Sequence, residues 1–87
     1  MMGVMESSGV TIFDTSIGLC GIAWRGGTIV GVELGGADEK ETRYRLRMRF
    51  AGAEAAVPPG FVTEAIDKIR ALLDGASPDF SQTPLAL

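Results

Sequence analysis

Histidine is absent from this 87-residue chain, and cysteine occurs once, as Cys20. Histidine is the commonest general base and shares with cysteine the role of zinc ligand, so neither a zinc site nor a histidine-activated nucleophile is expected. One cysteine also excludes an internal disulfide, which is compatible with a cytoplasmic location. No residue pattern calls for a bound cofactor, and we expect none.

Long apolar runs and an excess of positive charge are also missing. No run approaches the ~18 residues that a membrane span requires, so no membrane association is expected. Residues 1–9 lack the basic and apolar parts of a signal peptide, and we predict a flexible leader there. The net charge of −3 disfavours a protein devoted to non-specific nucleic-acid binding. The remaining residues, 10–87, are predicted to form a single small globular domain.

The stretch 10–34 predicts an antiparallel meander of three strands. Its apolar positions alternate within Val10–Thr15, Leu19–Arg25 and Thr28–Leu34. Gly26-Gly27 is a strong signal for a two-residue hairpin, because both glycines accept positive φ. Turn-forming residues at 15–18 predict the other connection.

Alternation also assigns faces to these strands. In the second strand, Cys20, Ile22 and Trp24 share one face. The opposite face carries Leu19, Gly21 and Ala23, and its small residues would let another element approach closely. In the third strand, period two predicts one face made of Val30, Val32 and Leu34, with Ile29, Gly31 and Glu33 on the other.

Two helices are predicted after the sheet. Asp38 with Glu41 three residues later is a capping box. The segment that follows, Thr42–Phe50, alternates like a strand but has the residue propensities of a helix. We predict a helix over Asp38–Phe50, a choice that the resemblance described below decides. On this helix, Thr42, Leu46 and Phe50 would line one face, and Tyr44 and Met48 would point elsewhere.

The second predicted helix covers Phe61–Asp74. Its apolar stripe consists of Val62, Ile66, Ile69 and Leu73. Gly75 is the expected C′ residue, and Pro78 prevents continuation. Residues 51–60 are expected to form a loop. The tail, Phe80–Leu87, is a candidate for a further edge strand.

The ordered set of these segments resembles the N-terminal domain of methylated-DNA–protein cysteine methyltransferases. The likeness spans about Thr11–Leu87 and is carried by Phe13–Gly18, Gly21–Trp24, Ile29–Val32, the arginine-rich segment ending at Phe50, Ala65–Gly75, Asp79–Ser81 and Pro84–Leu85. It implies an RNase H-like α+β fold, a small antiparallel sheet packed with two helices. In that family a separate helical domain follows, with a Pro-Cys-His-Arg nucleophile motif that this sequence lacks.

The resemblance implies a role in DNA alkylation repair without catalysis. No catalytic residue of the family can be placed on this chain, so we expect a scaffold domain that packs against a catalytic methyltransferase domain and meets DNA only through it. The chain would then be a truncated or split piece of such a protein, or a stand-alone domain. A homodimer is another expected arrangement, because a surface that normally meets a partner domain would be exposed and apolar.

The alternative is a stand-alone enzyme, for which two sets of residues are candidates. Cys20 would be an atypical alkyl acceptor, but no neighbouring motif activates it, and a buried small hydrophobe is the favoured interpretation. A metal-dependent nuclease would need clustered carboxylates, and the candidates are Asp14, Glu33, Glu39 and Glu41. We favour turn and helix-start roles for these acids.

One candidate nucleic-acid contact remains. Arginine occupies every second position of one segment, with Tyr44 between the first two; the four are Arg43, Arg45, Arg47 and Arg49. Such a row can contact phosphates. The favoured interpretation is a solvated face balanced by nearby glutamates, given the acidic total.

Overall fold

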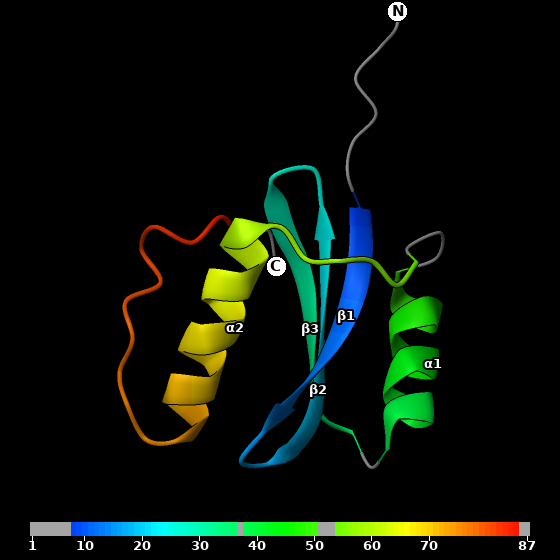
Figure 1. Cartoon of the computed structure of the whole chain (residues 1–87), viewed down its shortest axis with the longest axis horizontal. Helices are drawn as coiled ribbons and strands as arrows, with labels where there is room; N and C mark the ends of the chain where they lie inside the picture. Colours follow the sequence, from blue (N-terminus) through cyan, green and yellow to red (C-terminus); the bar gives the residue numbers. More distant parts are fainter. Residues whose placement is uncertain (1–7, 37, 51–53, 86–87) are drawn as a thin grey trace, which may run out of the picture.

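The fold is a three-stranded antiparallel sheet between two helices (Figure 1). The computed structural model describes residues 8–36, 38–50 and 54–85. The elements in chain order are β1 (Ser8–Thr15), β2 (Gly18–Arg25), β3 (Thr28–Gly36), α1 (Glu39–Arg49) and α2 (Gly60–Leu73). The predicted small α+β fold is confirmed, and α1 and α2 cover opposite faces of the sheet.

The strand boundaries correct the predicted leader. Residues 1–7 lie outside the described part, but Ser8 and Gly9 belong to β1, where Gly9 pairs with Trp24. A Cβ on Gly9 would lie 2.7 Å from Cζ2 of Trp24. Glycine is therefore used here for close packing against an indole ring, and not for flexibility. The Gly26-Gly27 turn is confirmed, with φ of 59° at Gly26.

The larger apolar cluster lies between the sheet and α2. The sheet contributes alternate side chains and α2 contributes one face; the buried members are Phe13, Cys20, Ile22, Trp24, Ile29, Val62, Ala65 and Ile66. Ile69 and Leu73 pack at its margin, which confirms the predicted stripe. α2 ends at a Schellman motif in which Gly75 has φ of 98° and Ala76 N–H donates to Ala71 O at 2.9 Å.

A smaller cluster lies between the sheet and α1. Leu46 is fully buried against Val10 and Ala23. A Cβ on Gly21 would lie 2.5 Å from Cδ1 of Leu46, so α1 is the element that uses the predicted small-residue face of β2. Thr42 and Leu46 are buried and Phe50 is half-buried, so the face predicted for a helix is the one that meets the sheet.

The predicted faces of β3 are wrong. Val30 packs in the α1 cluster, whereas Val32 packs against the α2 cluster. The pairing explains this result: Ile29 lies opposite Trp24, but Gly31 lies opposite Ala23, which leaves Val30 as an extra residue. This β-bulge interrupts the period-two alternation within the strand.

Both outer strands of the sheet are partly paired with segments far away in sequence. On β1, Val10 N–H donates to Glu54 O at 3.0 Å, and Ala56 N–H donates to Val10 O at 3.2 Å. On β3, Ile29 N–H donates to Pro84 O at 2.8 Å. The further edge strand that we predicted for the tail is thus reduced to a single bridge between Ile29 and Leu85. The predicted loop is confirmed over 54–59, and 51–53 lie outside the described residues.

Candidate functional site

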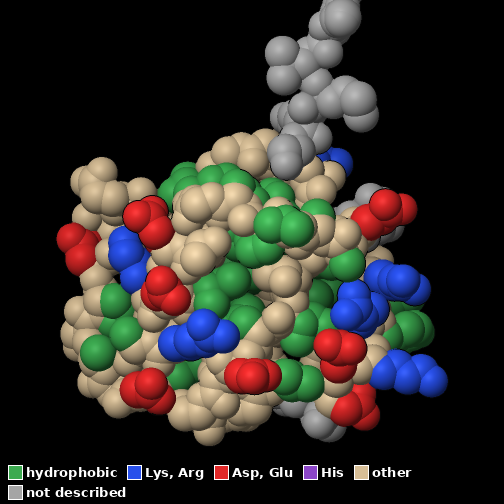
Figure 2. All heavy atoms as spheres, in the orientation of Figure 1, with side chains coloured by type: hydrophobic (Ala, Val, Ile, Leu, Met, Phe, Trp, Pro, Cys, Tyr) green, Lys and Arg blue, Asp and Glu red, His purple; other side chains and the backbone are tan. Residues whose placement is uncertain are grey.

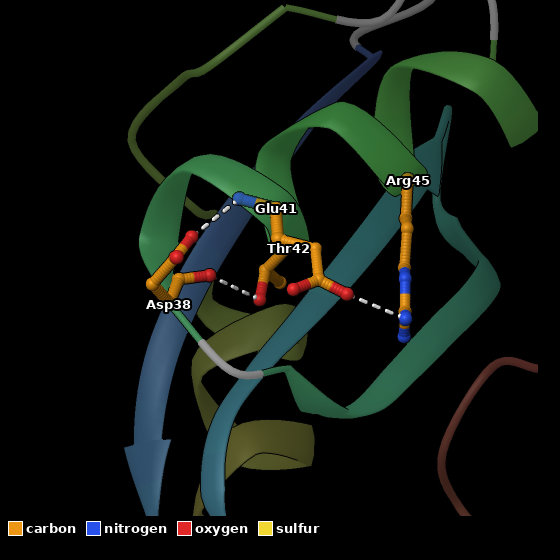
Figure 3. Close-up of polar contacts among 4 residues, drawn as sticks. All are labelled: Asp38, Glu41, Thr42 and Arg45. Carbon is orange, nitrogen blue, oxygen red and sulfur yellow. Dashed lines mark hydrogen bonds and ion pairs between the residues drawn. The ribbon is translucent and has the colours of Figure 1, made fainter.

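α1 is the candidate site because five of the eight Lys and Arg residues lie on it. Its start is fixed by Asp38, whose Oδ1 accepts a hydrogen bond from the Glu41 N–H at 2.7 Å (Figure 3). Thr42 Oγ1 donates to the Asp38 carbonyl at 2.9 Å. The predicted N-cap at Asp38 is therefore confirmed, but the Glu41 side chain of the predicted capping box instead accepts a hydrogen bond from Arg45 Nη2.

Replacing Asp38 with alanine is expected to destabilise the chain by about 1 kcal/mol, because the Glu41 N–H loses its acceptor. Urea unfolding followed by circular dichroism measures this change. Asp67→Ala is the matched control, since Asp67 is exposed within α2, and it should stay within about 0.5 kcal/mol of wild type. Equal effects of the two substitutions would contradict the capping role.

The four predicted arginines do not form one row. Successive residues on a helix are rotated by about 100°, so Arg43 and Arg47 lie on one side of α1, while Arg45 and Arg49 lie on another. Arg45 Nη2 lies 2.6 Å from Glu41 Oε1 (Figure 3), and Arg43 Nη2 lies 3.7 Å from Glu39 Oε2.

Arg49 crosses to the sheet. It pairs with Glu33 on β3 and has its guanidinium 5.0 Å from the centre of the Phe50 ring. Arg47 is exposed and has no ion pair among the described residues. The structure thus gives three of the four arginines a carboxylate partner, in line with the favoured interpretation of a charge-balanced face.

Three of the four candidate carboxylates have a structural role, whereas the fourth, Asp14, is an exposed residue whose backbone makes the contact. Glu39 and Glu41 lie in the first turn of α1, where a negative charge complements the helix dipole. Glu33 pairs with Arg49, and the backbone carbonyl of Asp14 accepts from Arg70 Nε at 2.9 Å. Over residues 8–36, 38–50 and 54–85, no three His, Cys, Asp or Glu side chains are grouped so that they could hold a metal ion.

Cys20 is fully buried between β2 and α2. Its Sγ lies 3.5 Å from Oγ1 of Thr15, and its other neighbours are apolar. A thiol acts as a nucleophile only as an accessible thiolate, so this position favours packing over reaction. The prediction that Cys20 is a buried small hydrophobe is confirmed.

A thiol reagent should therefore reach Cys20 only after the chain opens. In native buffer, labelling is expected to be more than about 100-fold slower than in denaturant, because a folded domain of ordinary stability exposes its core rarely. Labelling by a chromogenic disulfide measures the rates. Ser77→Cys adds a thiol at an exposed position and should react at once. Similar native and denatured rates for Cys20 would contradict the burial.

One cleft was not predicted from the sequence. It has a volume of about 380 Å³ and lies between α2 and the tail, lined by Phe61, Glu64, Asp67, Lys68, Gln82, Thr83 and Pro84. Two of these lining residues are joined by a hydrogen bond, which Lys68 Nζ donates to Thr83 Oγ1 at 3.2 Å. Nearby, the backbone N–H of Ser81 donates to Asp79 and holds the pKa of that carboxyl below its ordinary value. No local motif marks the tail as a neighbour of α2.

Comparison of the chain with protein-family models, with curated proteins and with solved structures gives no match. Neither helix in the described part of the chain has the length and apolar character needed to cross a membrane. The function must therefore be argued from the positions of the chain's own residues.

Proposed function

We propose that this chain is a non-catalytic scaffold domain, related to methylated-DNA–protein cysteine methyltransferases, that supports a catalytic domain by packing against it. The observation that carries the proposal is the full burial of Cys20. This cysteine is the sole thiol in a sequence without histidine. The side chain most suited to alkyl transfer is thus part of the core. The domain would then function by binding through its surface.

The packing of the sheet supports a role in binding through the helices. Both sheet faces are covered, one by α1 and the other by α2. Each outer strand also has a bridge to a distant segment. A partner would then meet the outer sides of the helices or the ends of the sheet. Large apolar side chains are exposed in such places, including Tyr44 and Met48 on α1.

The direct test adds this chain to a separately produced catalytic domain that carries the Pro-Cys-His-Arg motif of a family methyltransferase. A chain present at 100 times its Kd should stabilise that domain by about 2.7 kcal/mol, measured as a rise in its thermal midpoint. Cys20→Ala is the matched variant and should stabilise equally, because the thiol has no chemical part in the effect. An unchanged midpoint, with no complex in sedimentation, would contradict the proposal.

A further inference from the structure

α1 has an outer face that consists of Lys40, Tyr44, Arg47 and Met48. Leu46 packs against the sheet. By the helix rotation of about 100° per residue, Tyr44 and Met48 lie on the opposite side of α1, and Lys40 and Arg47 lie on one flank between the two sides. All four are exposed, with Tyr44 at 62% and Met48 at 67%. Figure 2 shows Lys and Arg side chains over α1, with hydrophobic and acidic side chains among them.

This outer face differs in charge from the rest of the molecule. Residues 38–50 hold five cationic and three acidic side chains, a net charge of +2, which leaves −5 for the rest of a chain whose total is −3. The one carboxylate beside Tyr44 and Met48 is Glu41, which lies on the flank away from Lys40 and Arg47 and is paired with Arg45. Lys40 and Arg47 have no ion pair within the described residues, whereas the neighbouring Arg43 and Arg45 are paired with Glu39 and Glu41.

We infer that the outer face of α1 is a docking surface for an acidic, amphipathic protein segment. Tyr44 and Met48 are four residues apart, so they form one ridge that can pack against an apolar stripe. By the same rotation, Lys40 and Arg47 both lie on one flank of this ridge. The partner segment should therefore carry its carboxylates along one side of its apolar stripe. Tyr, Met and Arg are the residue types that protein interfaces favour.

The charge distribution also favours a protein segment over a nucleic acid as the partner. A polynucleotide extends past the face and meets the acidic remainder of the chain, whereas a short segment covers the cationic face alone. Two unpaired cations neutralise few phosphates, and nucleic-acid affinity comes largely from such contacts. The thioether of Met48 and the ring of Tyr44 gain more from an apolar protein surface than from a phosphate backbone.

A selection of random 16-residue peptides displayed on phage tests the inference on the intact chain. The enriched peptides should be acidic, with apolar residues at helical spacing. Tyr44→Ala should weaken the best synthetic peptide by about tenfold, and Arg47→Gln by a few-fold. Gln82→Glu lowers the net charge by the same one unit far from α1 and is the matched control, with affinity expected within about twofold of wild type. Circular dichroism confirms that each variant is folded.

Several results would overturn the inference. These are enriched peptides without acidic character, no enrichment, or binding that Tyr44→Ala leaves unchanged. Binding of a 15-nucleotide oligothymidylate that Arg47→Gln abolishes would assign the face to nucleic acid. Self-association that Tyr44→Ala abolishes in light scattering would assign it to a second copy.

The inference rests on the proposed scaffold role, because that role makes the catalytic domain the source of the acidic segment. The docking face and the scaffold role can nevertheless be contradicted by different results. If Tyr44→Ala stabilises the catalytic domain as well as wild type does, the scaffold role stands and this docking face is wrong. If wild type has no effect on the catalytic domain while acidic peptides still bind the face, the docking face stands and the scaffold role is wrong.

Discussion

Trp24→Ala is expected to destabilise the chain by about 3–5 kcal/mol, the usual cost of removing a large aromatic side chain from a core. Trp24 is 1% exposed and is the largest fully buried side chain of the described residues. It packs in the α2 cluster and against Gly9. A small domain has limited stability to lose, so much of this variant should be unfolded at 37 °C.

The matched control for Trp24 is phenylalanine. The indole Nε1 is buried without a hydrogen-bond partner among the described residues, and an unpaired buried N–H costs about 1–3 kcal/mol. Trp24→Phe removes that N–H while keeping an aromatic ring, so it should cost less than half as much as Trp24→Ala. Urea unfolding followed by circular dichroism compares the two, because neither variant retains a tryptophan. A loss below about 1 kcal/mol for Trp24→Ala would contradict the position of Trp24 in the core.

Leu46→Ala should cost about 2–5 kcal/mol, because the removed side chain leaves a cavity between α1 and the sheet. Leu46 is fully buried, whereas Tyr44 on the same helix is 62% exposed. Tyr44→Ala is therefore the control, expected within about 0.5 kcal/mol of wild type. At about 4–8 °C per kcal/mol, the two variants are easily separated by their thermal midpoints. Equal midpoints would mean that α1 does not pack as described.

A second substitution locates the cavity. Gly21→Ala alone should cost roughly 1–3 kcal/mol, because its Cβ would lie 2.5 Å from Leu46 Cδ1. In the Leu46→Ala background the same Cβ enters vacant space, so the cost should fall to near zero or become a gain. The expected coupling is about 0.5–3 kcal/mol. Additive effects would place Gly21 and Leu46 out of contact.

Features set by a few neighbouring residues could be predicted from the sequence. The turn at Gly26-Gly27, the cap at Asp38 and the C′ glycine at Gly75 all depend on local backbone geometry, and all three are confirmed. The α2 stripe follows from helical spacing in the same way. The α1 segment was harder, because its arginines alternate like a strand. The cap and the residue propensities favour a helix, and the resemblance decided between the two.

Features that depend on distant partners could not be predicted. The bulge at Val30 arises from the pairing of β3 with β2, and no residue type at that position signals it. The ion pair between Arg49 and Glu33 joins a helix to a strand. For the candidate site, the sequence identified the arginines but not which of them remain unpaired. That distinction required the positions of Glu33, Glu39 and Glu41.

The central claim is that this domain acts through its surfaces and that Cys20 is not an alkyl acceptor. The most direct test is the intact mass of the chain after incubation with duplex DNA containing O6-methylguanine, with a full-length family methyltransferase as the positive control. The buried position of Cys20 predicts an unchanged mass for this chain while the control gains one methyl group. A stoichiometric gain of one methyl group, lost in Cys20→Ala, would contradict the claim.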